Sequence, residues 1–221
     1  MTVKELETYF NQKWNKTIFR GTVTKLSKPK KGKSLVISKF EMFNFDAIMR
    51  YESNPEQPSS VDGIYFLNGN LHLVEFKTGF YQKIRKGRSD FDKENAKCPH
   101  TKSICEDYWK QFTDRQDKER DILYDSLKLK ALETYLFLEK KIGFIKNKSD
   151  PGKVILNIVI DENGIDGLEL GLSELSDDPK TSVKDSMHRF KNQKDINQNI
   201  YCYDEINVYS GEGFSNIINS L

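Results

Sequence analysis

The chain has 221 residues, a length that suits a single domain over residues 1–221 with a full core. Its formal net charge is +2, and 37% of its residues are hydrophobic and 31% charged. No apolar run approaches the ~18 residues that cross a bilayer, the N-terminus lacks the apolar stretch of a secretion signal, and three cysteines argue against a disulfide framework. These observations exclude membrane-spanning, secreted-scaffold and strongly basic nucleic-acid-coating classes, and they favour a cytoplasmic protein with no membrane partner.

The first expected elements are a helix and a strand. Thr2 and Glu5 predict a capping box at the helix start, and four apolar residues then share one helical face: Val3, Leu6, Phe10 and Trp14. A loop with five lysines follows at residues 25–33. From about residue 35 to residue 51 apolar and polar residues alternate, which predicts a strand.

A β-hairpin is the clearest local prediction. Two apolar runs, residues 61–67 and 71–77, are separated by Asn68-Gly69, the strongest short hairpin signal. If these two residues form the turn, Leu67 pairs with Asn70, and the register follows by counting. A three-residue turn that includes Asn70 would shift the register by one residue.

The rest of the chain completes an α/β pattern. Residues 81–118 are charged and poor in aliphatics, which predicts a long excursion outside the core. An apolar stripe then predicts a helix over about residues 119–142, and VILNIVI at 154–160 is typical of a strand buried on both faces. Another strand at about 205–209 and a short helix belong to a C-terminal extension, residues 161–221, so the sheet is expected to be mixed.

Two carboxylates stand out once the hairpin is in register. The two-residue turn places Asp62 opposite Glu75 on one face of the sheet, and Lys77 shares that face at the strand end. The three-residue turn would instead place Asp62 opposite Phe76. Like charges that face each other are destabilising, and a hard divalent cation between them would explain the pair. The alternative is an ordinary hairpin whose solvent face carries a salt bridge.

The triplets Val61-Asp62-Gly63 and Glu75-Phe76-Lys77 resemble the motif of the PD-(D/E)xK nuclease superfamily, with Val61 in place of the name-giving proline. The expected element order over roughly residues 2–80 and 119–160 is also similar to that family's core. The resemblance implies an α/β, restriction-endonuclease-like αβββαβ core with a central mixed β-sheet flanked by helices. It further implies Asp62 and Glu75 as ligands of Mg²⁺ (or Mn²⁺) and Lys77 as the catalytic lysine.

The resemblance implies two additional site residues, and the charge pattern after the motif indicates four more. Many members carry a metal-binding carboxylate on the first helix, and Glu7 lies at the edge of its apolar stripe. Many also use a polar residue on the helix after the motif, where Lys128 is our candidate, ahead of Lys130. Four cations directly after the motif are candidates for phosphate contact: Lys83, Arg85, Lys86 and Arg88.

The function expected from the sequence is a metal-dependent nuclease that hydrolyses phosphodiester bonds in nucleic acid, with DNA favoured over RNA. The alternative is a catalytically silent nuclease-fold module that binds nucleic acid or protein, such as an accessory or inhibitory protein of a mobile element or defence system. A second apolar strip on the long helix, Leu129, Leu132 and Leu136, permits a homodimer, and coverage by residues 165–221 would explain it equally well.

Overall fold

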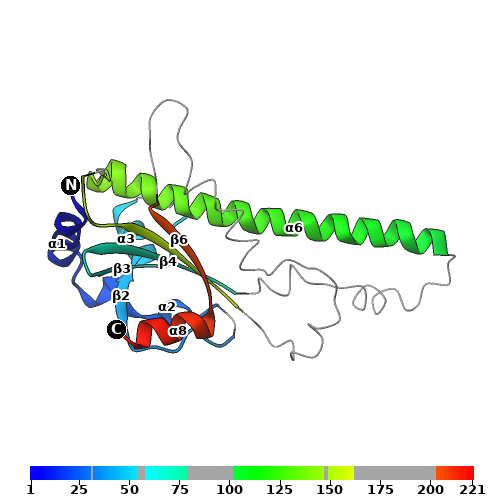
Figure 1. Ribbon diagram of the computed structural model, residues 1–221, viewed down its shortest axis with the longest axis horizontal. Coiled ribbons are helices and arrows are strands. Elements are labelled where there is room, and N and C mark those ends of the chain that lie inside the picture. The colour runs from blue at the N-terminus through cyan, green and yellow to red at the C-terminus, as the bar shows by residue number, and fades with distance from the viewer. Residues whose placement is uncertain (31, 54–57, 79–101, 147–148, 162–202) are drawn as a thin grey trace.

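The computed structural model describes residues 1–30, 32–53, 58–78, 102–146, 149–161 and 203–221. A six-stranded sheet runs through it in the spatial order β1-β2-β3-β4-β5-β6 (Figure 1). The strands are antiparallel from β1 to β4 and parallel from β4 to β6. Their bounds are β1 Arg20–Thr22, β2 Glu41–Asn44, β3 Gly63–Leu67, β4 Asn70–Lys77, β5 Val154–Ile160 and β6 Glu205–Ser210. The expected α/β class with a mixed sheet is confirmed.

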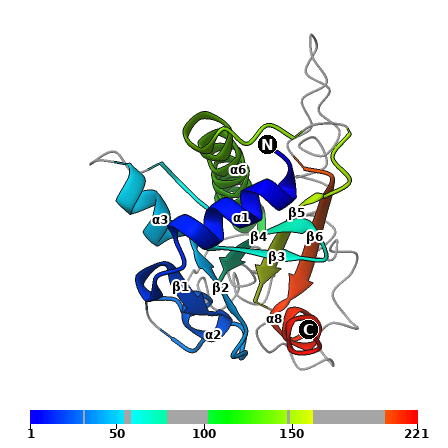
Figure 2. The same ribbon diagram turned by 90° about the vertical axis from the view of Figure 1, so that its left-hand side faces the viewer.

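Helices cover both faces of the sheet. On one face lie α1 (Val3–Lys13) and α6 (Lys102–Phe137), and on the other lie α2 (Val23–Leu26) and α8 (Gly211–Asn219), as Figure 2 shows. A 3₁₀ turn, η1 (Thr17–Phe19), joins α1 to β1. The larger core lies on the α1 and α6 side, because the apolar faces of both helices and of α3 (Phe45–Glu52) pack there. The α2 and α8 side has a smaller core of its own.

The local signals near the N-terminus and in the hairpin are confirmed. Thr2 and Glu5 form the capping box, since each side chain accepts a hydrogen bond from the other residue's backbone N–H. Asn68 and Gly69 both have positive φ, 50° and 75°, as a two-residue hairpin turn requires. Leu67 pairs with Asn70, so the two-residue register is correct and the three-residue alternative is wrong.

The strand expected at about residues 35–51 is confirmed only over four residues in its middle. The chain forms β2 only over Glu41–Asn44 and then the helix α3. Asn44 caps this helix by accepting a hydrogen bond from the backbone N–H of Ala47 at 3.1 Å. Phe45, Ile48 and Met49 are buried at helical spacing. The same stretch of the chain also fits the alternation of a strand, and the strand prediction followed that pattern.

The long helix begins earlier than its apolar stripe indicated. α6 starts at Lys102, so residues 102–118 of the charged stretch are helical, while residues 79–101 lie outside the described part of the chain. Charged residues are good helix formers, and a missing apolar stripe therefore does not exclude a helix. α6 continues far beyond the sheet in Figure 1 and ends in a π-helical turn, η2 (Leu138–Ile142), and then Gly143 at φ 79°.

The second apolar strip of α6 is not buried. Leu129, Leu132 and Leu136 are 47%, 39% and 40% exposed, so coverage of this strip by another part of the chain is not seen among the described residues. The homodimer remains a prediction. Within the described ranges, no helix combines the length and the apolar character that crossing a bilayer demands.

Candidate active site

Asp62, directly before β3, lies beside Glu75 of β4. Gly63 pairs with Val74, so the next pair along the hairpin is Asp62 beside Glu75, as the sequence predicted. Both side chains lie on the face that α6 covers. The Asp62 side chain is 20% exposed and the Glu75 side chain 3% exposed, which leaves two acidic groups largely shielded from water.

Three hydrogen bonds fix the position of Asp62. Its carbonyl accepts the Phe45 N–H at 3.1 Å, and its Oδ2 accepts the Phe76 N–H at 2.7 Å. The preceding N–H, that of Val61, donates to Thr134 Oγ1 on α6 at 3.0 Å. β3 begins directly after Asp62, so the strand, α3 and α6 together hold this carboxylate.

Lys130, on α6, provides the cation that faces both carboxylates. Its Nζ lies 2.8 Å from Glu75 Oε1, 2.9 Å from Glu75 Oε2 and 3.9 Å from Asp62 Oδ1. The lysine side chain is 24% exposed. A buried carboxylate without a partner is costly, and this lysine supplies the partner that Glu75 needs.

The electrostatics of the cluster follow from burial. Burial raises the pKa of Asp62 to about 6, although the Lys130 charge and the Phe76 N–H act in the opposite direction. Burial and the neighbouring Asp62 charge raise the pKa of Glu75 well above its usual range. Burial alone would lower the pKa of Lys130, but the two carboxylates outweigh it and the pKa is raised.

Lys77, the expected catalytic lysine, lies on the same face at the end of β4. Its Nζ donates to Ser126 Oγ on α6 at 3.3 Å. Its positive charge partly opposes the rise in the pKa of Glu75. The Lys77 carbonyl accepts the Asp161 N–H at 3.3 Å. The hairpin therefore brings Asp62, Glu75 and Lys77 together as the motif implied.

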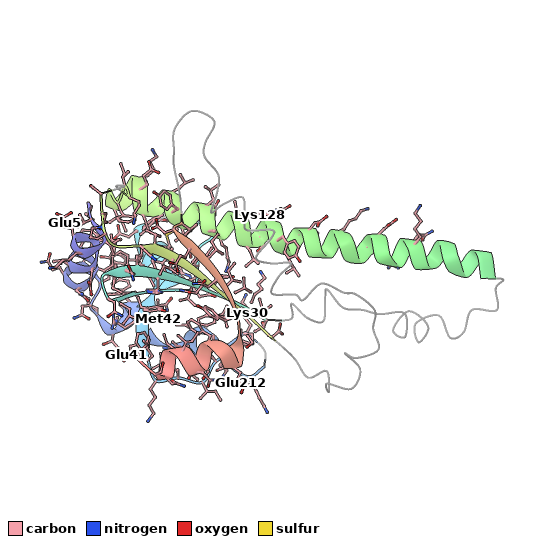
Figure 3. The ribbon with its side chains drawn as sticks, viewed as in Figure 1. Glu5, Lys30, Glu41, Met42, Lys128 and Glu212 are labelled. Atoms are coloured by element: carbon pink, nitrogen blue, oxygen red, sulfur yellow. The ribbon has the colours of Figure 1, made fainter. Side chains whose placement is uncertain are left out.

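The lysine of α6 that reaches the carboxylates is Lys130 and not Lys128, which we ranked first. Lys128, labelled in Figure 3, pairs with Asp125 at 3.1 Å on the same helix. At 100° per residue the two lysines lie about 80° from the centre of the buried stripe, on opposite edges. A helical wheel therefore cannot show which of the two lysines faces the carboxylates. The packing of α6 on the sheet decides it.

The other predicted residues are not part of this cluster as described. Glu7 is half-buried on α1, and no hydrogen bond or ion pair joins it to Asp62, Glu75 or Lys130 among the described residues. The four basic residues predicted to contact phosphate, Lys83, Arg85, Lys86 and Arg88, lie outside the described part of the chain.

Thr134 and Ser126 are site residues that the sequence reasoning missed. Thr134 is fully buried, and it interrupts the apolar stripe of α6 between Ala131 and Leu138. A polar residue on a buried stripe must find a hydrogen-bond partner, so its position was a usable signal. Ser126 lies on the Lys130 edge of the helix and carried no comparable signal.

The donor chemistry of the pair fits Mg²⁺ or Mn²⁺. Carboxylate oxygens are the ligands these ions prefer, and Mg²⁺ is commonly held by one or two carboxylates with water and substrate phosphate completing its shell. Within the described residues there is no group of three His, Cys, Asp or Glu placed to hold a metal. Asp62 and Glu75 would therefore have to hold the ion largely by themselves.

A polar pocket of about 200 Å³ lies beside Asp62. Two cations line it, Lys25 of α2 and Arg50 of α3, together with the carboxylates Asp46 and Asp62. The Asp46 charge contributes to the raised pKa of Asp62. The pocket thus places the cations of Lys25 and Arg50 next to Asp62, the more exposed of the two carboxylates.

Comparison of the chain with protein-family models, curated proteins and solved structures finds no match. Any function must therefore be argued from the residues and geometry of the site.

Proposed function

We propose that the protein is a metal-dependent nuclease that hydrolyses phosphodiester bonds in nucleic acid, with DNA the favoured polymer. One observation carries the proposal: Asp62, directly before β3, lies beside Glu75 of β4, both are largely buried, and Lys77 lies on the same face. Because burial raises the pKa of both acids, the pair is costly to the fold unless a cation shares the site. Such an arrangement is typical of functional sites.

Each residue has a distinct role in the proposal. Asp62 and Glu75 would hold the divalent ion, and when bound it would supply positive charge that polarises the phosphate and activates a water. Lys77 orients that water or stabilises the negative charge that develops on the phosphate, as a fixed cation next to the reacting group can. Ser126 restricts the position of the Lys77 ammonium, because the Ser126 hydroxyl accepts a hydrogen bond from Lys77 Nζ.

The pocket beside Asp62 supports a polyanionic substrate. Lys25 and Arg50 are exposed, and neither side chain enters the hydrogen bonds or ion pairs of the described residues. Cations that are not engaged elsewhere can neutralise phosphates next to the scissile bond. Homodimer formation through Leu129, Leu132 and Leu136 is a further proposal that rests on their exposure.

A catalytically silent nuclease-fold module is the second candidate. The observation that favours it is Lys130, which contacts both oxygens of Glu75 and so already neutralises the pair. Under this proposal the cluster is a structural ion pair, and the module binds nucleic acid or protein without turnover.

A nuclease assay with matched variants separates the two candidates. The purified protein is incubated with circular single-stranded DNA, supercoiled DNA and a structured RNA, each with Mg²⁺, Mn²⁺ or EDTA. Glu75→Gln and Lys77→Ala are compared with Asp125→Asn and Lys140→Ala, which remove exposed charges from α6 and η2. Cleavage that needs metal and is lost only in the first two variants establishes the nuclease. Absence of cleavage in every arm, with no Mn²⁺ binding by calorimetry, favours the silent module.

A further inference from the structure

Lys130 occupies the carboxylates that the proposed function assigns to a metal. Its Nζ lies within 2.9 Å of both Glu75 oxygens and 3.9 Å from Asp62 Oδ1. The other oxygen of Asp62, Oδ2, already accepts the Phe76 N–H. Three of the four carboxylate oxygens therefore face this ammonium, and the fourth is partly engaged by a backbone N–H.

Two cations cannot share these oxygens cheaply. Glu75 is 3% exposed, so water screens little of the repulsion between an ammonium and a divalent ion bound to the same carboxylate. Without any cation, however, two buried carboxylates would be left unpaired, which is also costly. The site is expected to hold one cation at a time, either the lysine or the metal.

The Lys130 ammonium can move away from the carboxylates when a metal ion binds. Lys77 does not have to move. The Lys130 side chain is 24% exposed, and a lysine can move its ammonium into water while its stem stays packed. Lys77 donates instead to Ser126 Oγ on α6 at 3.3 Å, a contact that does not involve the oxygens of Asp62 or Glu75. The motif lysine can therefore stay in place whichever cation the carboxylates hold.

We propose that Lys130 is an internal competitor of the metal: its ammonium holds Asp62 and Glu75 in the metal-free protein and must be displaced before a divalent ion binds. The inference rests on the proposed function, and it adds a residue that sets the metal concentration at which the site fills. Lys130, which lies on α6 outside the motif, would then lower the affinity of the site for the metal ion.

Calorimetry on the metal-stripped full chain tests the inference without substrate. Mn²⁺ is titrated into the wild-type protein, Lys130→Met, Lys130→Gln and Lys77→Met, with Lys140→Met as a surface control. We expect the two Lys130 variants to bind Mn²⁺ at least tenfold more tightly than wild type. Lys77→Met is expected to tighten binding less, through loss of a nearby charge only, and Lys140→Met is expected to bind like wild type.

Thermal unfolding with and without Mn²⁺ gives a second readout. Lys130→Met is expected to be less stable than wild type without metal and to gain more stability than wild type from Mn²⁺, since a tighter ligand stabilises more. Lys130→Gln keeps a hydrogen-bond donor for Glu75, which preserves a folded variant if the methionine variant unfolds.

The possible outcomes distinguish this inference from the proposed function. Binding by the Lys130 variants that is tighter than wild type, or that occurs when wild type binds no Mn²⁺, supports the competition. If wild type binds Mn²⁺ and the Lys130 variants bind it equally or more weakly, the competition is refuted, while the proposed metal site still stands. Absence of Mn²⁺ binding in every protein refutes both this inference and the metal-dependent function.

Discussion

Replacing Asp62 with asparagine should stabilise the metal-free protein at high pH. The pKa of Asp62 is raised from the usual 3.8 to about 6 because the group is buried, and the nearby Asp46 charge acts in the same direction. At about 1.4 kcal/mol per pKa unit, the ionised side chain destabilises the fold by at most about 3 kcal/mol. A fifth of the side chain remains in contact with water, so we expect about 2 kcal/mol. Asparagine removes the charge and keeps an oxygen for the Phe76 N–H.

The pH dependence gives the sharper test of this reasoning. Because the folded pKa is raised, the folded protein binds more protons than the unfolded chain between about pH 3.8 and 6, and stability falls as pH rises through that window. The stabilisation by Asp62→Asn should therefore be full at pH 8 and fall to about a third at pH 4.5. Urea unfolding in EDTA at both pH values measures it, with Asp125→Asn as the exposed control. A variant less stable than wild type at pH 8, or a gain that does not shrink at pH 4.5, would refute the reasoning.

Three further predictions concern a buried hydrogen bond, a close packing contact and a partly buried histidine. Thr134→Val removes the acceptor of the buried Val61 N–H and should cost about 1–3 kcal/mol in urea unfolding, whereas a cost below about 0.5 kcal/mol would argue against that hydrogen bond. Gly63→Ala places a Cβ against Met42 Sδ and should cost about 1–3 kcal/mol, and a double-mutant cycle with Met42→Ala should recover part of it if this overlap is the cause. Burial lowers the pKa of His72 to about 4, so its ring should stay neutral in an NMR titration down to about pH 5, and stability should be lost as pH falls from about 6.5 towards 4.

The two carboxylates are not equivalent in their effect on the stability of the metal-free protein. From the hairpin, the two carboxylates simply repel each other, and removal of either should stabilise the metal-free protein. The structure makes them unequal, because Lys130 contacts both oxygens of Glu75 and only approaches Asp62. Removal of Glu75 would leave Lys130 without its closest partner, so Asp62 is the residue whose removal should stabilise.

The sequence by itself determined the hairpin and the face that carries the motif. The turn depends on two residues that accept positive φ, Asn68 and Gly69, and such a preference is local. Once the turn is known, strand alternation places Asp62, Glu75 and Lys77 on one face without any knowledge of the rest of the fold. The capping box of α1 and the buried strand β5 are local signals of the same kind.

Tertiary structure alone decided which side chains complete the site. Lys128 and Lys130 are equivalent on a helical wheel, and the direction in which α6 crosses the sheet places Lys130 on the carboxylates. Residues 45–52 fit two periods, and packing into the core selected the helix. In each case the local pattern was compatible with two arrangements, and contacts between residues far apart in the chain selected one of them.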